Sequence, residues 1–477
     1  MILDVSGHVS TSKSLIIFFF FLFHFPQVCY KAADFDFGGD VSSRKTKDPR
    51  LVASSLIQDV LDQSFFVNEL LNDSLSAFDF PKRRFITELV YGTVRNLTHL
   101  DYWILKVFKK PLKKIDKNLL SLLRVSLYQI LFMSNREAAT IVFEAAELAK
   151  RCGNEKTAGF VNFILREILR IGPTRENMEA DFEGKHDEFL QTWYSVPNWF
   201  FARIKTQAET LGKDVEEYLQ IVNKPLGITL RIEGNEEVRQ QIIEKLVAKG
   251  ASAEEAKRSP YGICTNKAVN FSMLKGFDDI YIQDESSQLS VLEMDIKPGD
   301  KILDMCAAPG GKTLFASYLT GENGFVTAVD VNGNRLNMLA DVVIQHGKKN
   351  IGMKLHDATK DNPEWHEAFD RVLLDAPCSA LGTVRRHPEI KWIKNDNDPQ
   401  KMASISGKIL EQASKYLKKG GVMVFSVCTF TQEETTEQIR RFSAHHPEFS
   451  VERSYFTVAD INDNRDIFFI CRMRKIK

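Results

Sequence analysis

The first regular feature of the chain is a helical spacing of apolar residues over 51–171. Apolar side chains recur there at intervals of three and four, most clearly over 119–131. This spacing gathers apolar side chains on one face of a helix, so it predicts an all-helical bundle. Gly172 and Pro173 end its last helix, and a further helical stretch is predicted around 193–222.

The pattern changes from helical spacing to alternation near Pro225. Residues 228–232 alternate between apolar and polar, as a half-buried strand does. Residues 238–246 then form an amphipathic helix that Gly250 closes. A small α/β module is therefore predicted ahead of residue 281.

Beyond that module, short apolar runs alternate with helical stretches. Such alternation is typical of a mostly parallel, doubly wound Rossmann-like sheet, which binds ligands at the carboxyl ends of its strands. The predicted strands are 301–305, 325–330, 352–356, 369–375 and 421–428. The fold class is therefore α/β, and we expect five segments: an extension at 1–47, a helical domain at 48–172, a helical connector at 173–222, the small α/β module at 223–280 and the Rossmann-like domain at 281–477.

The N-terminal segment and the composition bear on location. Lys13 precedes an apolar run at 14–23, which has the length of a signal-peptide core and is short for a membrane span. Both a leader and a nonfunctional extension remain possible for this segment. The extension is favoured because the rest of the sequence has an intracellular character.

Charge and cysteine content bear on partners and location. Lys plus Arg and Asp plus Glu number 63 each, so an anionic partner needs a local basic patch. The seven scattered cysteines fit neither a disulfide framework nor a CxxC metal site, and they predict a reducing, cytoplasmic setting without a membrane.

Small residues and a carboxylate follow the first predicted strand. Asp304 ends that strand, and Cys306-Ala307-Ala308-Pro309-Gly310-Gly311-Lys312 leads into a helix. A Walker A loop would need glycine in place of Cys306, and no G-x-G-x-x-G is present, so phosphate binding is the weaker hypothesis. Asp304 would repel a pyrophosphate and attract a ligand amine.

The next two strands also end in carboxylates. Asp330 follows the glycines by roughly twenty residues, where an acidic side chain usually binds ribose hydroxyls. Asp357 ends the third strand and can accept an adenine amino proton. A single surface aspartate after a strand is common, but three at successive strand ends favour S-adenosylmethionine, which carries an amine, a ribose and an adenine.

Two cysteines follow the fourth and fifth strands. Cys378 comes three residues after Asp375, and Cys428 ends the fifth strand. Each alone is more often a small core residue, but at the ligand edge both are candidates for a partly exposed catalytic thiol. A thiolate that adds to C6 of a pyrimidine makes C5 nucleophilic towards a sulfonium methyl, and Asp375 can stabilise that adduct. The second thiol can assist release, and the residues themselves leave open which cysteine attacks.

Three motifs resemble the Sun family of RNA cytosine-5 methyltransferases. They are the segment from Asp304 to Lys312, Asp375-Ala376-Pro377-Cys378-Ser379, and Arg385-Arg386-His387-Pro388-Glu389-Ile390-Lys391-Trp392. The resemblance implies S-adenosylmethionine-dependent methylation of cytosine C5 in small-subunit (16S) ribosomal RNA through a covalent cysteine–C6 adduct. It implies Cys428 as the nucleophile, Cys378 as a helper in product release and Asp375 as a third catalytic residue. It implies cofactor binding by Cys306, Ala307, Ala308, Pro309, Gly310, Gly311, Lys312, Asp330, Asp357 and Asp375.

The resemblance extends over most of the chain. The helical region is similar to a NusB-type RNA-binding domain at 88–95 and 127–131. The module at 223–280 looks like the RRM-like module that accompanies this catalytic domain. Two residues depart from the family: Val427 stands where Thr is usual, and Thr435 stands where Asn is usual. These departures bear on the local geometry around the nucleophile.

RNA contacts are expected at two basic segments. Six lysines fall within twelve residues at 106–117 and could neutralise phosphates, although a solvated helix face explains them equally well. The second segment is expected to hold the RNA backbone and stack a base, through Arg385, Arg386, His387, Lys391 and Trp392.

Two other functions remain open at this stage. The departures around Cys428 are compatible with a catalytically silent RNA-binding assembly factor. A cytosine methyltransferase that acts on DNA or on a different RNA is the other alternative. The preferred hypothesis is a monomer that acts on small-subunit ribosomal RNA without a metal.

Overall fold

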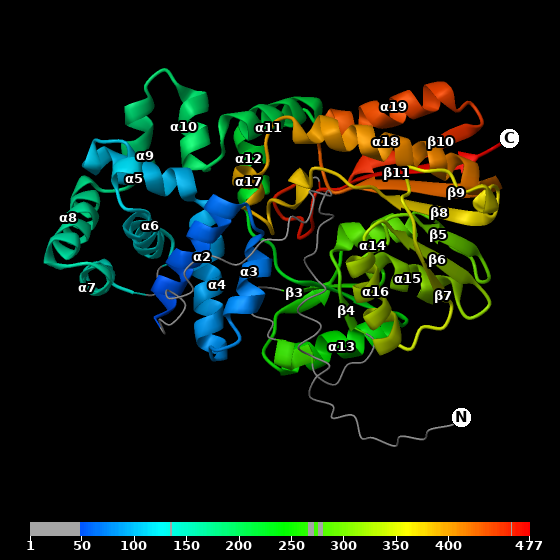
Figure 1. Ribbon diagram of the computed structural model, residues 1–477, viewed down its shortest axis with the longest axis horizontal. Helices are drawn as coiled ribbons and strands as arrows, with labels where there is room; N and C mark the ends of the chain where they lie inside the picture. The colour runs from blue at the N-terminus through cyan, green and yellow to red at the C-terminus, as the bar shows by residue number, and fades with distance from the viewer. Residues whose placement is uncertain (1–47, 134–135, 266–270, 275–279, 459) are drawn as a thin grey trace. The chain divides into compact units, whose positions relative to one another are not determined.

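The computed structural model describes residues 48–133, 136–265, 271–274, 280–458 and 460–477 (Figure 1). The described chain forms two compact units. The catalytic unit, as we name it, comprises 225–382 and 397–477, and the helical unit comprises 48–224 and 383–396. The apolar run predicted at 14–23 lies outside the described residues.

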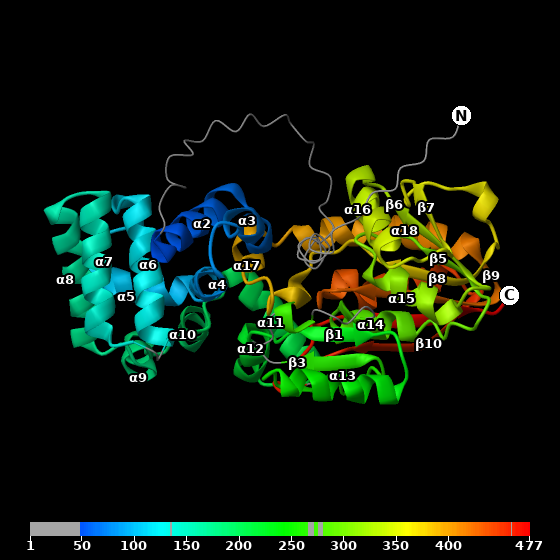
Figure 2. The same ribbon diagram turned by 90° about the horizontal axis from the view of Figure 1, so that it is seen from below.

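The helical unit confirms the predicted all-α region. Asp48 caps its first helix by accepting a hydrogen bond from the backbone N–H of Arg50 at 2.9 Å. Figure 2 shows three of its helices, α6, α7 and α8, side by side. The helices are α2 (Pro49–Gln63), α3 (Val67–Ser74), α4 (Phe80–Arg95), α5 (Leu97–Phe108), α6 (Lys117–Phe132), α7 (Ala138–Cys152), α8 (Glu155–Ile171), α9 (Arg175–Glu179), α10 (His186–Trp193), α11 (Asn198–Thr210), α12 (Val215–Asn223) and α17 (Ile390–Ile393).

The small α/β module at the start of the catalytic unit is a four-stranded antiparallel sheet. Its strands β1 (Thr229–Ile232), β2 (Ala253–Glu255), β3 (Gly262–Thr265) and β4 (Ile280–Ile282) lie in the order β2-β3-β1-β4. Helix α13 (Glu236–Ala248) connects β1 to β2. The buried core of the module includes Leu230, Ile232, Leu246 and Ile263. The sequence-based expectation of a small α/β module is confirmed.

The large sheet of the catalytic unit confirms the predicted Rossmann-like domain. Its order is β10-β11-β9-β8-β5-β6-β7, and the pairs from β9 to β7 are parallel. The strands are β5 (Lys301–Asp304), β6 (Phe325–Asp330), β7 (Ile351–Leu355), β8 (Phe369–Asp375), β9 (Leu417–Val427), β10 (Phe449–Phe456) and β11 (Phe469–Lys475). Strands β5, β6 and β7 lie side by side and reach one edge of the sheet, and the next strand in sequence, β8, pairs with the opposite side of β5. The carboxyl ends of β5 and β8 therefore flank the point where a doubly wound sheet binds its ligand.

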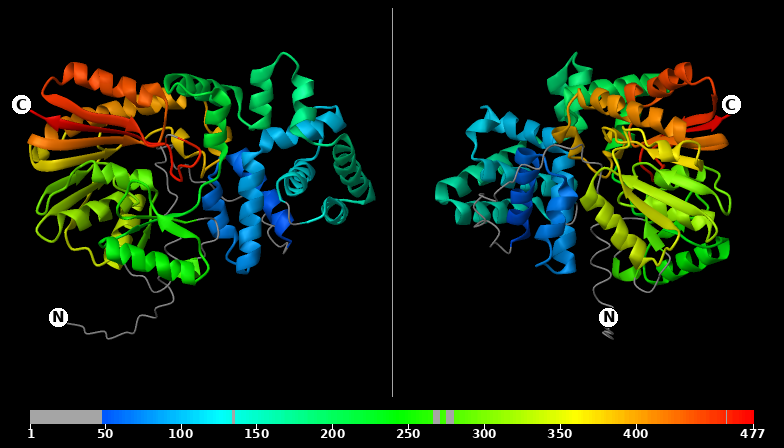
Figure 3. Two further views of the ribbon diagram at one scale, coloured as in Figure 1. Left: turned by 180° about the vertical axis from the view of Figure 1, so that it is seen from behind. Right: turned by 45° about the vertical axis from the view of Figure 1, so that its right-hand side comes forward.

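Helices cover both faces of this sheet (Figures 1 and 3). Helices α14 (Glu285–Leu292), α15 (Gly311–Thr320) and α16 (Gly333–Gln345) lie on one face, and α18 (Asp398–Tyr416) and α19 (Thr436–His445) lie on the other. Strand β10 escaped the sequence analysis because it is a mostly exposed edge strand in which Glu452-Arg453-Ser454 interrupts the apolar residues. Among the described residues, no helix has both the length and the apolar character that a bilayer crossing requires.

Candidate active site

The loop after β5 brings its backbone against β6. The N–H of Ala307 donates to the carbonyl oxygen of Val329 at 2.9 Å. Gly310 has a φ of 111° and caps α15, and a Cβ added to it would lie 2.3 Å from Cδ1 of Leu339. Only glycine fits such a backbone without strain. The residues expected at the cofactor, 306–312, therefore form a close turn at the carboxyl end of β5.

Asp304, at the end of β5, offers an unused acceptor. Its Oδ2 accepts a hydrogen bond from Oγ1 of Thr313 at 2.7 Å, whereas Oδ1 has no partner of normal geometry among the described residues. Burial raises the pKa of this carboxyl to about 7, and the hydrogen bond from Thr313 opposes that rise. A buried, unsatisfied carboxylate oxygen is costly unless a ligand pairs with it. Asp304 therefore fits the cationic amine of S-adenosylmethionine.

Asp330 ends β6, as expected from the sequence, whereas β7 ends at Leu355 and Asp357 follows it by two residues. Oδ1 of the buried Asp330 accepts from the N–H of Asn332 at 2.9 Å, and Oδ2 lies 3.4 Å from Nη1 of Arg335. Asp357 accepts a hydrogen bond from Oγ1 of Thr359 at 2.6 Å, which lowers its pKa. The N–H of His356 donates to the carbonyl oxygen of Asp330 at 3.1 Å, so the two acidic strand ends are neighbours.

Two apolar side chains beside these carboxylates were missed by the sequence analysis. Val331 follows Asp330 and is 54% exposed, and Leu355 ends β7 and is 64% exposed. Exposed apolar side chains next to polar ones suit the two faces of an aromatic base. The signal in the sequence is an apolar residue within two positions of each of these aspartates.

Asp375 and Lys312 form an ion pair between the ends of β8 and α15. Nζ of Lys312 lies 2.7 Å from Oδ2 of Asp375, and Oγ of Ser426 donates to Oδ1 at 2.8 Å. Burial lowers the pKa of Lys312, but the Asp375 carboxylate, together with Cys428 and Asp304, raises it by more in total, so its pKa lies above the ordinary value. Lys312 is therefore a fixed positive charge at this edge of the sheet.

The thiols of Cys378 and Cys428 lie side by side, as the order of their strands suggested. Their sulfur atoms are 3.3 Å apart. The side chains are less accessible than the expected partly exposed site, because only 5% of Cys378 and 8% of Cys428 is exposed. The contact with Cys378, burial and the Asp375 carboxylate raise the pKa of Cys428 well above its usual value, and Lys312 lowers it. The Cys428 thiol is therefore protonated at neutral pH in the free protein.

Glu434 is a second buried group that the sequence analysis did not assign. It lies in the 3-10 turn Gln432–Glu434, a few residues after Cys428. Its carboxylate accepts hydrogen bonds from residues adjacent to both cysteines, Ser379 and Thr429. Ser379 and Thr429 directly follow the two cysteines in the sequence.

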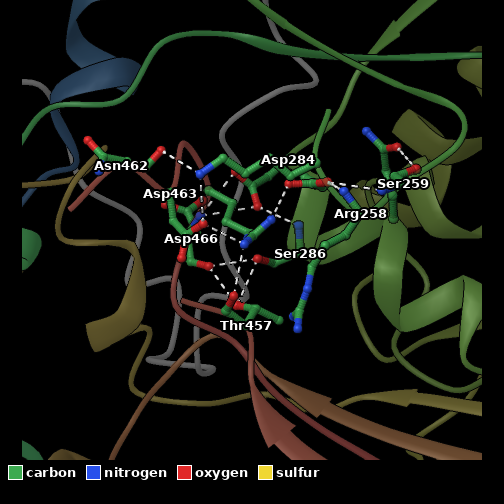
Figure 4. A network of polar contacts seen from close by, with 12 residues as sticks. Arg258, Ser259, Asp284, Ser286, Thr457, Asn462, Asp463 and Asp466 are labelled. Carbon is green, nitrogen blue, oxygen red and sulfur yellow. Dashed lines mark hydrogen bonds and ion pairs between the residues drawn. The ribbon is translucent and has the colours of Figure 1, made fainter. Parts of the chain in front are cut away.

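A polar network joins the small module to the segment before β11 (Figure 4). Asp284 accepts from the backbone N–H of Asp466, and Oγ of Ser286 donates to the carbonyl oxygen of the same residue at 2.7 Å. Glu285 accepts from the backbone N–H of Ser259 at 2.9 Å and pairs with Arg465 at 2.5 Å. The end of the segment 462–466 is thus held by buried polar contacts.

The prediction that residues 385–392 contact RNA is wrong for Arg385, His387 and Lys391. Arg385, His387 and Lys391 are buried, and the whole segment 383–396 packs within the helical unit. Nζ of Lys391 donates to the carbonyl oxygens of Arg95 and Ser195, both at 2.7 Å. Burial, together with the charge of Arg95, lowers the pKa of Lys391 well below its usual value. These side chains hold the helical unit together and are not available to phosphates.

The other basic segment is exposed over part of its length. Lys106 pairs with Asp181, and Lys117 pairs with Asp62 at 2.8 Å. The remaining lysines of the segment are exposed, and none forms an ion pair among the described residues. We call these four residues the lysine patch: Lys109, Lys110, Lys113 and Lys114.

Family models match three parts of the chain. Residues 291–469 match the family described as 16S rRNA methyltransferase RsmB/F. Residues 47–170 match the NusB family, and residues 196–272 match the ferredoxin-like domain of RsmF/B-like methyltransferases. The order β2-β3-β1-β4 of the small module is the order of a ferredoxin-like sheet. These matches agree with the three kinds of architecture in the structure.

Individual relatives match almost the whole chain. The probable ribosomal RNA small subunit methyltransferase B of Bacillus subtilis is 32% identical over 91% of this chain and 99% of its own. The ribosomal RNA small subunit methyltransferase B of Proteus mirabilis is 30% identical over 82% of this chain and 90% of its own. The crystal structure of PH0851 has the same fold, with a TM-score of 0.70 and 24% identity over 90% of this chain and 99% of that one. The chain therefore belongs to the ribosomal RNA small subunit methyltransferase B family, and it is an RNA methyltransferase that uses S-adenosylmethionine.

Proposed function

We propose that this protein methylates C5 of a cytosine in small-subunit (16S) ribosomal RNA through a transient bond between Cys428 and C6 of the base. The observation that carries this proposal is the contact between the two thiols at the end of the parallel sheet, 3.3 Å apart. A cofactor site alone would serve many methyl acceptors. A pair of thiols beside it suits an acceptor carbon that must first be made nucleophilic.

The proposed reaction begins with loss of the Cys428 proton. The thiolate sulfur forms a bond to C6, and the C5–C6 π electrons move towards C5 and the ring. S-adenosylmethionine, when bound, would supply the methyl group: the C5 electrons would form the new carbon–carbon bond, the methyl–sulfonium bond would break, and its electron pair would stay on the sulfur of the departing S-adenosylhomocysteine. The proton on C5 then leaves to a base, its electrons restore the C5–C6 double bond, and the C6–S bond breaks. Cys378, next to Cys428, is placed to return a proton to the departing thiolate.

Lys312 and Asp375 provide the electrostatics of this step. The ammonium of Lys312 lowers the pKa of Cys428, which favours its thiolate. Asp375 holds Lys312 at 2.7 Å. A carboxylate has further lone pairs, so Asp375 can also accept a hydrogen bond from the cytosine ring as charge develops there.

The cofactor site follows from the same strand ends. Oδ1 of Asp304 would accept a hydrogen bond from the amine, and Asp330 would accept from the ribose hydroxyls. Asp357 would accept from the adenine amino group, with Val331 and Leu355 against the ring faces. The turn 306–312 would line the sulfonium end of the ligand. Oδ1 of Asp304 has no partner of normal geometry among the described residues, and Val331 and Leu355 are exposed, so these groups are available to the ligand.

The lysine patch is the proposed contact for the phosphate backbone of the RNA. Its four ammonium groups are exposed and lack ion-pair partners among the described residues. Phosphate neutralisation by such groups gives affinity without sequence specificity. The relatives named for ribosomal RNA support this class of partner, which is consistent with action in the cytoplasm.

The test uses labelled methyl donor and small-subunit RNA, with matched DNA as a second substrate. Wild-type protein should label C5 of cytosine in the RNA and should form a covalent adduct with RNA that contains 5-fluorocytosine, because fluorine at C5 prevents release. The Cys428→Ser variant should lose both activities. The Cys378→Ser variant should still form the adduct and release product slowly.

Other outcomes would overturn the proposal. Retained adduct formation in Cys428→Ser with loss in Cys378→Ser would reverse the roles of the two thiols. Tight RNA binding with no detectable methyl transfer by the wild-type protein would support an assembly factor instead. Labelling of DNA but not RNA would refute the proposed substrate class.

A further inference from the structure

Glu434 connects the two loops that carry the thiols. Its Oε1 accepts a hydrogen bond from the backbone N–H of Ser379 at 2.6 Å. Its Oε2 accepts from Oγ of Ser379 at 2.6 Å, from Oγ1 of Thr431 at 2.7 Å and from Oγ1 of Thr429 at 3.2 Å. Only 1% of the residue is exposed. One carboxylate thus binds four donors in a nearly water-free site.

Two of these donors lie directly beside the cysteines in the sequence. Ser379 directly follows Cys378, and Thr429 directly follows Cys428. Oγ of Ser379 and Oγ1 of Thr429 are also 3.0 Å apart, so the two hydroxyls lie beside each other where both donate to the carboxylate. Each thiol is therefore one residue away from a group bound to Glu434. The carboxylate is the shared acceptor of two loops that are about fifty residues apart in sequence.

We propose that Glu434 is a positioning residue that holds the Cys378 and Cys428 loops at the separation where their thiols touch. The inference rests on the proposed function, because it assigns the machinery that keeps that thiol pair aligned. Glu434 does not contact the reacting atoms in this proposal. It acts through the backbone N–H and hydroxyl of Ser379 and the hydroxyl of Thr429.

Hydrogen-bond chemistry explains why a carboxylate is needed at this position. A backbone N–H can only donate, so an oxygen must face Ser379. The second oxygen receives three hydroxyl groups, and an ionised carboxylate has enough lone pairs for all of them. Burial raises the pKa of Glu434 to about 7, and the hydrogen bonds from Ser379 and the two threonines oppose that rise. The four donors therefore favour the ionised form of Glu434, and the ionised carboxylate in turn holds the two loops.

Thr435 contributes to the same arrangement. Its Oγ1 donates to the carbonyl oxygen of Thr431 at 2.6 Å, and Thr431 in turn donates to Glu434. The family usually has Asn at this position. The departure from the family pattern is therefore accommodated by a hydroxyl that fixes one of the four donors.

The test measures thiol alignment separately from methyl transfer. Diamide removes two electrons and two protons from a neighbouring thiol pair, which leaves a disulfide and a reduced hydrazine product. The rate of Cys378–Cys428 disulfide formation, followed by mass spectrometry without RNA, reports how often the sulfur atoms meet. Adduct formation with 5-fluorocytosine RNA in a single turnover reports the chemical alignment of Cys428.

Glu434→Gln is the principal variant because it keeps the size of the side chain. Its amide oxygen can face Ser379, but its NH2 group would have to donate to hydroxyls that now donate to the carboxylate. We expect disulfide and adduct formation to slow by at least tenfold, with the Kd for S-adenosylmethionine unchanged within about twofold. Thr429→Val, which removes one donor at constant shape, should slow both steps by a smaller factor.

Glu233→Gln is the matched control. Glu233, in the small module, is a buried carboxylate of the same unit, and it pairs with Arg231 at 3.2 Å and with Lys348, which follows α16, at 2.6 Å. This variant should lower the melting temperature and leave disulfide and adduct rates at the wild-type level. Such a result would show that loss of a buried charge does not by itself misalign the thiols.

The outcomes separate this inference from the proposed function. Wild-type rates of both steps in folded Glu434→Gln and Thr429→Val would overturn the positioning role, whatever Cys428 does. If wild-type protein forms no RNA adduct, the proposed function fails, and the diamide rates still decide whether Glu434 aligns the thiols. A Glu233→Gln variant as slow as Glu434→Gln would assign the effect to general destabilisation and refute the inference.

Discussion

Replacement of Gly382 by alanine tests how tightly the catalytic loops are packed. The N–H of Gly382 donates to the carbonyl oxygen of Cys428, and its own carbonyl oxygen accepts from the N–H of Ile467, both at 3.0 Å. A Cβ at this position would lie 1.9 Å from the carbonyl oxygen of Ile467 and 3.0 Å from that of Cys428. Both obstacles are backbone atoms, so no side-chain rotation relieves the clash.

The magnitude follows from the size of the displacement. To bring the contact with Ile467 from 1.9 Å to an ordinary distance, one of the two backbones must move by more than about 1 Å. Overpacking of this kind costs about 1–3 kcal/mol, which corresponds to a fall in melting temperature of roughly 2–12 °C for a unit of this size. A catalytic group displaced by about 1 Å loses roughly a hundredfold in rate.

The assay is single-turnover methyl transfer at a temperature well below the melting transition of the Gly382→Ala variant. Gly159→Ala is the control, because nothing lies within 4 Å of a Cβ at that position in helix α8. A helix-interior change from glycine to alanine should stabilise by about 0.5–1 kcal/mol and leave the rate unchanged. A Gly382→Ala variant with the wild-type melting temperature and rate would refute the reasoning from backbone contact.

Three further predictions concern the cofactor, the nucleophile and the RNA. Asp330→Asn should raise the Kd for S-adenosylmethionine, measured by calorimetry, by about 10–100-fold, because a charged hydrogen bond contributes about 1.5–3 kcal/mol. A Kd within twofold of wild type would contradict the binding of the ribose hydroxyls by Asp330. The pKa of Cys428 is raised, so its thiolate fraction and the adduct rate should increase about tenfold per pH unit between about pH 7 and 9, and a rate independent of pH in that interval would contradict this. Replacement of the lysine patch with glutamine should reduce the slope of log K against log salt by about 0.7–0.9 per lost phosphate contact, whereas an unchanged slope would place the RNA elsewhere.

The sequence by itself determined the order of the elements and the residue at each strand end. Helical spacing and strand-like runs depend on neighbours within about ten residues, so they can be recognised without tertiary contacts. Because the parallel strands β8 and β9 are adjacent, their carboxyl ends had to bring Cys378 and Cys428 close to each other. Asp304, Asp330 and Asp357 were predictable for the same reason.

The tertiary structure alone decided which polar groups are buried and what satisfies them. The charges of Arg385 and Lys391 suggested exposure, but the partners of Lys391 lie nearly 200 and 300 residues earlier in the chain. Glu434 was not assigned from the sequence, because its partner Ser379 comes from a loop about fifty residues away. Spacing along a chain reports only local periodicity, whereas the free energy of a buried polar group depends on donors and acceptors that folding brings from distant segments.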